Sequence, residues 1–115
     1  MARPKDLVRL RHMLEATQKM LEFTKDRTRC SLDEDEMLTL ALLRLLEILG
    51  EAAKGVSSEL RQTYPQIPWK QLAGTRDRLI HGYFDVDLDI IWTIISRDLP
   101  PLLAELEKIA SLEDG

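Results

Sequence analysis

Apolar residues recur with helical spacing along almost the whole chain. In the first segment, leucines stand three, four and seven residues apart, at positions 7, 10, 14 and 21. This spacing places them on one face of a helix and predicts a helix over about residues 5–26. Pro4 suits its first turn, because a first-turn amide has no partner inside the helix. A chain with this periodicity is expected to fold by packing helix against helix.

The next segment predicts the most buried helix of the protein. Between Met37 and Val56 the only charged residues are Arg44, Glu47, Glu51 and Lys54, spaced three, four and three apart. They form one narrow polar stripe, and the rest of the helix surface is apolar. A serine or an aspartate of residues 31–36 is expected to cap this helix, and Gly55 to end it.

The second half of the chain predicts three further helices. A short one covers residues 57–64, and Pro65 and Pro68 then interrupt the chain. A third long helix is expected from Trp69 until Gly82 closes it, although Gly74 lies inside it. The last runs from about residue 87 to 112, is capped by an aspartate of residues 85–89, and kinks at its two adjacent prolines. The predicted fold is a single all-α domain over residues 1–115, an antiparallel four-helix bundle with a short extra helix.

Composition excludes several kinds of site. One cysteine and two histidines provide neither a disulfide framework nor a thiolate metal cluster, so no metal and no cofactor are expected. No segment resembles a signal peptide or a membrane span, and we expect a cytoplasmic protein with no membrane partner. The net charge of −4 opposes general nucleic-acid binding. Residues 61–81, however, hold four cations against one acid, which is a local basic segment.

Arg76 is the anomaly of the third predicted helix. On an ideal helix that starts at Trp69, it lies near the centre of the apolar face. A guanidinium there must be paired, or must open onto a cleft or a partner subunit. In the structural interpretation, it pairs with Glu47 or Glu51. On that interpretation Arg78, His81 and Tyr83 are ordinary residues at a helix C-terminus.

Residues 76–83 also resemble a known catalytic motif. Their sequence RDRLIHGY matches the RxxxxHxY pattern of the HepT-like toxins of the HEPN superfamily. Further stretches are similar to that family: ILGEAAK at 48–54, YPQIPW at 64–69, YFDVD at 83–87 and DLP at 98–100. The resemblance covers about residues 35–110.

The resemblance implies a metal-independent endoribonuclease that acts as a homodimer, with the motif at the subunit interface. His81 would exchange protons with the ribose 2′-hydroxyl and the leaving 5′-oxygen, and Arg76 would hold the scissile phosphate. The implied products are a 2′,3′-cyclic phosphate and a 5′-hydroxyl. Asp77 would orient His81 or Arg76, and Arg78 and Lys70 would offset the negative charge of Asp77.

The family also pairs with a minimal nucleotidyltransferase antitoxin. The resemblance implies that this enzyme transfers AMP to Tyr83, which would place a bulky anion two residues from His81. Two alternatives remain open from the sequence. In the first, the chain is a non-catalytic partner or substrate of a nucleotidyltransferase. In the second, it is a structural dimerisation bundle.

Overall fold

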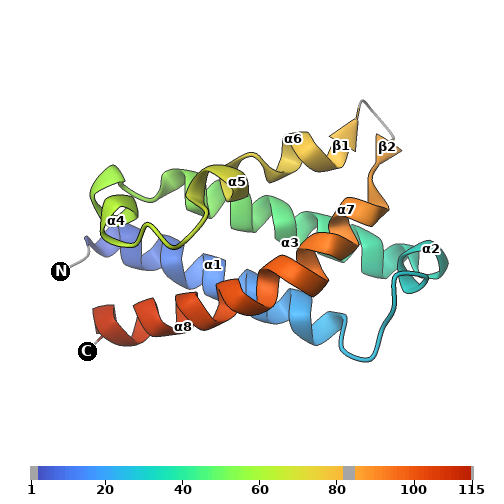
Figure 1. Ribbon diagram of the computed structural model, residues 1–115, viewed down its shortest axis with the longest axis horizontal. Coiled ribbons are helices and arrows are strands. Elements are labelled where there is room, and N and C mark those ends of the chain that lie inside the picture. The colour runs from blue at the N-terminus through green and yellow to red at the C-terminus, as the bar shows by residue number, and fades with distance from the viewer. Residues whose placement is uncertain (1–2, 82–84, 115) are drawn as a thin grey trace.

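The computed structural model describes residues 3–81 and 85–114 (Figure 1). Its first half contains α1, α2 and α3, which are followed by the short helix α4. Its second half contains two short helices, a pair of two-residue strands, and a long helical segment with a π-helical turn in the middle, η1. The bounds are α1 Pro4–Phe23, α2 Ser31–Glu34, α3 Glu36–Gly55, α4 Ser58–Thr63, α5 Trp69–Ala73, α6 Thr75–Leu79, β1 Ile80–His81, β2 Asp85–Val86, α7 Leu88–Thr93, η1 Ile94–Asp98 and α8 Leu99–Asp114.

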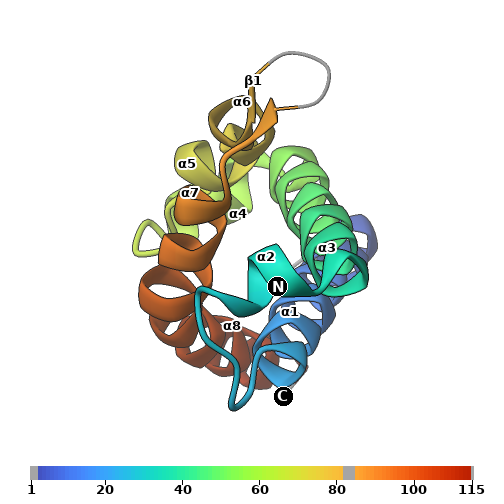
Figure 2. The ribbon, with the colours of Figure 1, turned by 90° about the vertical axis from the view of Figure 1, so that its right-hand side faces the viewer.

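Four helical segments, here called legs, run in alternating directions along the long axis of the molecule (Figure 1). The legs are α1, α3, the α5–α6 pair and the α7–η1–α8 segment, and Figure 2 shows them around a common interior. The short helix α4 lies at the end of the bundle where both termini are found (Figure 1). The predicted all-α antiparallel four-helix bundle with an extra short helix is confirmed.

The core is built from the apolar stripes of all four legs. α3 packs against α1 and against both α5 and α6, and α8 packs against α1. Large side chains that are almost fully buried come from every leg: Met13, Met20, Leu42, Leu46, Leu49, Leu79, Ile91, Leu99, Leu106 and Ile109. None of the helices in the described part of the chain is both long and apolar enough to cross a lipid bilayer.

Side-chain caps fix where three of the helices begin. Asp35 Oδ1 accepts from the Leu38 amide at 3.0 Å and starts α3, after residues 31–34 have formed the separate turn α2. Ser57 Oγ accepts from the Leu60 amide at the start of α4. Asp87 Oδ1 accepts from the Ile90 amide at 3.0 Å and starts α7, as the aspartate-rich segment predicts.

The third long helix differs from its prediction. It is divided at Gly74 into α5 and α6, and it ends at Leu79 instead of continuing to Gly82. Gly74 has φ −92° and ψ 4°, outside the helical range, which agrees with the low helix propensity of glycine. Ile80 is then extended and pairs with Val86, and the Asp87 amide donates to the Leu79 carbonyl at 2.8 Å. The strand pair therefore takes over the backbone hydrogen bonds that a longer helix would have made.

A π-helical turn, η1, precedes the two prolines at which the sequence predicts a kink. Pro100 and Pro101 carry no amide hydrogen, and in a regular helix their rings would clash with the carbonyls four residues earlier. Those carbonyls belong to Ser96 and Arg97, which both lie in η1. The wider π turn relieves that crowding and lets the helical segment continue into α8.

Candidate active site

The short helix α6 presents three charged side chains to solvent. Thr75 and Leu79 are buried, whereas Arg76, Asp77 and Arg78 are exposed. Successive residues of a helix are about 100° apart, so Asp77 points away from the core. Arg76 and Arg78 then lie on opposite flanks of α6, Arg76 toward α3 and Arg78 toward the last helical segment.

The prediction that Arg76 lies within the apolar face is wrong. The break at Gly74 restarts the helix, so Thr75 and Leu79 take the inward positions of α6 and Arg76 moves outward. The predicted pairing with Glu47 or Glu51 is not formed either, and Glu47 instead lies 3.8 Å from Arg44. Among the residues whose side chains the structure describes, Arg76 has no ion-pair partner, which leaves its exposed guanidinium available to an anion.

His81 follows α6 as the second residue of β1. The strands are antiparallel, and their register places Ile80 opposite Val86 and His81 opposite Asp85. Tyr83, the predicted modification site, lies outside the described residues. The structure thus puts the backbone of His81 at the end of the helix that carries Arg76, within one exposed corner of the bundle (Figure 1).

The start of α7 is linked by an ion pair to the connection that follows α1. Arg29, in the connection after α1, pairs with Asp89 at 2.7 Å and with Asp33 at 2.9 Å. Its hydrogen bond to Asp89, supported by Asp33, raises the pKa of the Arg29 guanidinium. The hydrogen bond from the Asp87 amide to the Leu79 carbonyl joins the start of α7 to the end of α6, and the ion pair between Arg29 and Asp89 joins it to the connection after α1.

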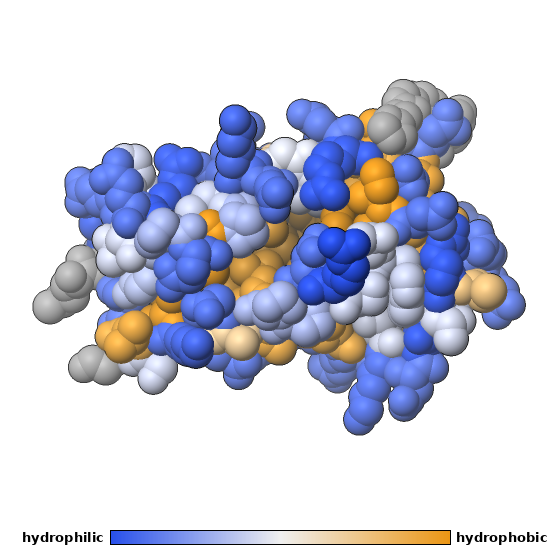
Figure 3. All heavy atoms as spheres, viewed as in Figure 1, coloured by the Kyte–Doolittle hydropathy of each residue, from blue (hydrophilic) through white to orange (hydrophobic). Residues whose placement is uncertain are grey.

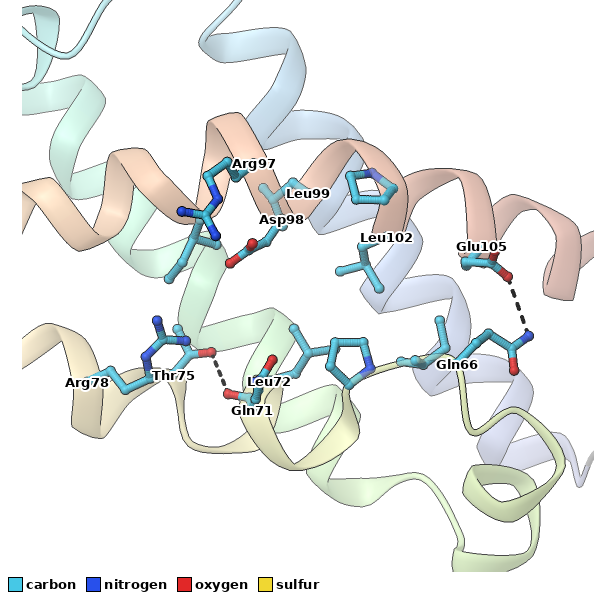
Figure 4. A pocket seen from close by; sticks show the side chains of 14 residues that line it. Gln66, Gln71, Leu72, Thr75, Arg78, Arg97, Asp98, Leu99, Leu102 and Glu105 are labelled. Carbon is cyan, nitrogen blue, oxygen red and sulfur yellow. Dashed lines mark hydrogen bonds between the residues drawn. The ribbon is translucent and has the colours of Figure 1, made fainter.

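A groove of about 290 Å³ opens on the Arg78 flank of α6, between α5–α6 and η1–α8 (Figure 4). Arg78 stands on one side of the groove, and Arg97 and Asp98 stand on the other. Its floor is apolar and consists of Ile67, Leu72, Ile94, Leu99 and Leu102. Sequence reasoning did not identify Arg97 or Asp98 as site residues. The available signal was a cation and an acid separated from the two prolines only by Leu99.

The described residues hold no group of three or more histidine, cysteine, aspartate or glutamate side chains that could bind a metal ion. The candidate site residues at this corner are the arginines of α6 and His81. A guanidinium binds phosphate through paired N–H donors, and an imidazole transfers protons near neutral pH.

Comparison with known proteins relates the sequence of this chain to one family. The family model described as Ribonuclease HepT-like matches residues 13–109. A Caldanaerobacter subterraneus protein named as a putative RNase is 38% identical over 104 residues, covering 90% of this chain and 93% of the relative. A Thermococcus cleftensis protein named probable ribonuclease HepT is 36% identical over 100 residues, covering 87% and 91%.

A third relative is longer than this chain. It is a Methanocaldococcus jannaschii protein named gamma-glutamylcyclotransferase and putative RNase, 42% identical over 100 residues. The match covers 87% of this chain but only 45% of that relative. No solved structure matches the chain at a significant level. The family model spans most of the bundle, from α1 to α8, and the chain belongs to the HepT-like ribonuclease family.

Proposed function

We propose that this protein is a metal-independent endoribonuclease, with Arg76 and His81 as its catalytic residues. The observation that carries the proposal is the exposed, unpaired guanidinium of Arg76 on α6, five residues before His81, in a chain of the HepT-like ribonuclease family. An exposed arginine without an ion-pair partner is suited to hold a phosphate whose negative charge increases during the reaction.

The proposed reaction is an internal transesterification. His81 accepts the proton of the ribose 2′-hydroxyl, and the 2′-oxygen attacks the neighbouring phosphorus. The bond from phosphorus to the 5′-oxygen breaks, and the leaving oxygen takes a proton from a second imidazole. The products are a 2′,3′-cyclic phosphate and a 5′-hydroxyl end. Asp77 orients Arg76 or His81 in this scheme, and Arg78 offsets the charge of Asp77.

A homodimer supplies the second imidazole. The other histidine of the chain, His12, lies on α1, so the second imidazole comes from His81 of another subunit. Exposed apolar side chains support an interface near the motif: Met37 is 83% exposed and Leu40 is 57% exposed. Both lie in the first turns of α3, at the end of the bundle where the β1–β2 pair stands (Figure 1). We therefore propose that this end meets its copy.

A nucleotidyltransferase antitoxin is the proposed regulator of this toxin in the cytoplasm of a prokaryotic cell. Its AMP transfer to Tyr83 would add a phosphodiester two residues from His81. The added negative charge would repel the RNA backbone and block the site. Intact-mass measurement after incubation with such an enzyme and ATP tests this step, with Tyr83→Phe as the variant that must stay unmodified.

The catalytic role of Arg76 is tested by comparing Arg76→Ala with Arg11→Ala. Arg11 is an exposed arginine on α1, outside the motif, and it controls for the loss of one positive charge. We expect Arg76→Ala to reduce the cleavage rate by about 100-fold or more, the cost of losing one donor to the transition-state charge. Products of the parent should carry 2′,3′-cyclic phosphate ends by mass spectrometry. Equal activity of the two variants would contradict the assignment.

A further inference from the structure

The groove beside α6 carries two guanidinium groups that face one another. Arg78 extends from α6 and Arg97 extends from η1 toward the same opening (Figure 4). Both side chains are exposed, and neither makes an ion pair with a residue in the described part of the chain. Two unpaired cations that converge from separate elements favour an anion between them, because each lowers the energy of the same bound charge.

Below this charged rim the groove is apolar. Its floor is formed by side chains of the core. Figure 3 shows hydrophobic surface in the hollow between α5 and α8. At the far end, Gln66 Nε2 donates to Glu105 Oε2 at 3.4 Å, across the groove (Figure 4). The groove is therefore short and bounded, with the cations at one end and apolar surface beside them.

The size of the groove limits what it can hold. Its volume of about 290 Å³ lies just below the usual range for small-molecule sites, about 300–1,000 Å³. That volume suits one ring system with a short substituent. It is too small for a peptide helix. A flat, largely apolar ring that carries an anion is the chemistry of a nucleotide, whose base has an apolar face and whose phosphate is charged.

A carboxylate at the rim adds a hydrogen-bond acceptor. Asp98 points into the groove from the same wall as Arg97 (Figure 4). A base edge offers N–H donors that a carboxylate accepts, whereas a fully ionised anion such as sulfate offers none. The carboxylate beside the two guanidiniums thus favours a nucleotide over a sulfate-like anion.

We propose that this groove binds one unpaired nucleotide of a single-stranded RNA, with its base on the apolar floor and its phosphate between Arg78 and Arg97. The inference rests on the proposed ribonuclease function and adds a binding site next to the cleavage site. Arg76 and Arg78 lie on opposite flanks of α6, so a strand held at Arg78 passes the end of α6 to reach Arg76 and His81.

Binding is measured with a fluorescent 2′-O-methyl RNA, which lacks the attacking hydroxyl and cannot be cleaved. We expect Arg97→Ala to weaken binding about tenfold, as expected for the loss of one charged hydrogen bond. The slope of log affinity against log salt concentration should become about 0.7 less steep, because each phosphate contact to a single strand contributes about that amount. Arg11→Ala, on α1 and far from the groove lining, is the matched control. Equal losses in the two variants would overturn the proposal.

A second readout locates the base. In a methyl NMR spectrum, the signals of Ile94, Leu99 and Leu102 should shift when a nucleoside 5′-monophosphate is added. Ribose 5-phosphate, which has no base, should shift them far less. Methyl signals that do not respond to the nucleotide would also overturn the proposal.

The same variants separate this inference from the proposed function. RNA that binds in an Arg97-dependent manner but is never cleaved contradicts the ribonuclease proposal and supports the groove. Cleavage by the parent with an unchanged KM in Arg97→Ala supports the ribonuclease and contradicts the groove.

Discussion

Gly50 of α3 lies so close to the backbone of α5 that no side chain larger than a hydrogen atom fits there without strain. The position of α6, which follows α5, therefore depends on this glycine. A Cβ built on Gly50 would lie 2.8 Å from the carbonyl oxygen of Leu72, which is backbone of α5. Carbon and oxygen atoms do not approach that closely without strain, so in Gly50→Ala either α3 or α5 must move. Since α5 leads directly into α6, the displacement is passed to the segment that carries Arg76 and Arg78.

The expected loss of stability is the difference between two terms. Forcing an extra methyl into a packed contact costs about 1–3 kcal/mol. Replacing glycine by alanine inside a helix contributes about 1 kcal/mol of helix propensity in the opposite direction. Gly50→Ala should therefore lower the free energy of unfolding by about 1 kcal/mol. For a domain of this size, that loss corresponds to a Tm lower by about 4 °C.

Gly74→Ala is the matched control, because it makes the same chemical change at a glycine with room. The nearest atom to its added Cβ is the Lys70 carbonyl oxygen at 3.5 Å, an ordinary contact, and its φ of −92° suits alanine. We expect it to raise stability by about 0.5 kcal/mol, through the lower entropy of the unfolded chain. Thermal unfolding followed by circular dichroism compares the two. A Gly50→Ala variant as stable as Gly74→Ala would refute the packing argument.

Three further predictions concern stability. Asp6 is buried and accepts from the Ser57 amide at 2.9 Å and the Ser57 hydroxyl at 2.6 Å; Asp6→Ala should cost about 2 kcal/mol in urea unfolding, because both donors lose their acceptor. The Tyr64 hydroxyl donates to Glu113, and this bond, with burial, raises the pKa of Tyr64. The stabilisation is therefore complete below the unfolded pKa of about 10 and is lost as pH rises through the folded value. The parent should exceed Tyr64→Phe in stability at pH 7 and lose that advantage in strongly alkaline buffer; a pH-independent difference would contradict this. Arg76→Ala should change stability by less than about 0.5 kcal/mol, since the side chain is exposed and unpaired; a large loss would favour the structural interpretation of Arg76.

The long helices could be predicted from the sequence because local signals and burial agree there. The leucine spacing of the first segment predicted a helix over 5–26, and α1 covers Pro4–Phe23. Gly55 ends α3 as expected, and an aspartate caps α7. In each case a residue that favours a helix end, namely Pro4, Gly55 or Asp87, stands near the point where the apolar pattern starts or stops, so one window of sequence contains the information.

The candidate site could not be placed in the same way. The position of Arg76 depends on the break at Gly74, and that break accompanies the close approach of α5 to Gly50, a contact between residues far apart in the chain. The strand pair after α6 likewise depends on pairing between Ile80 and Val86. The groove of Arg78 and Arg97 joins two legs, so no single window of sequence contains it.

The most direct test of the ribonuclease proposal is RNA cleavage in excess EDTA by the parent, His81→Ala and His12→Ala, after intact-mass analysis has shown that Tyr83 carries no AMP. His12 is an exposed histidine of α1 and controls for the loss of an imidazole. We predict EDTA-resistant cleavage by the parent and by His12→Ala, and a loss of about 100-fold or more in His81→Ala. Absence of cleavage by the unmodified, dimeric parent, or full activity of His81→Ala, would contradict the assignment.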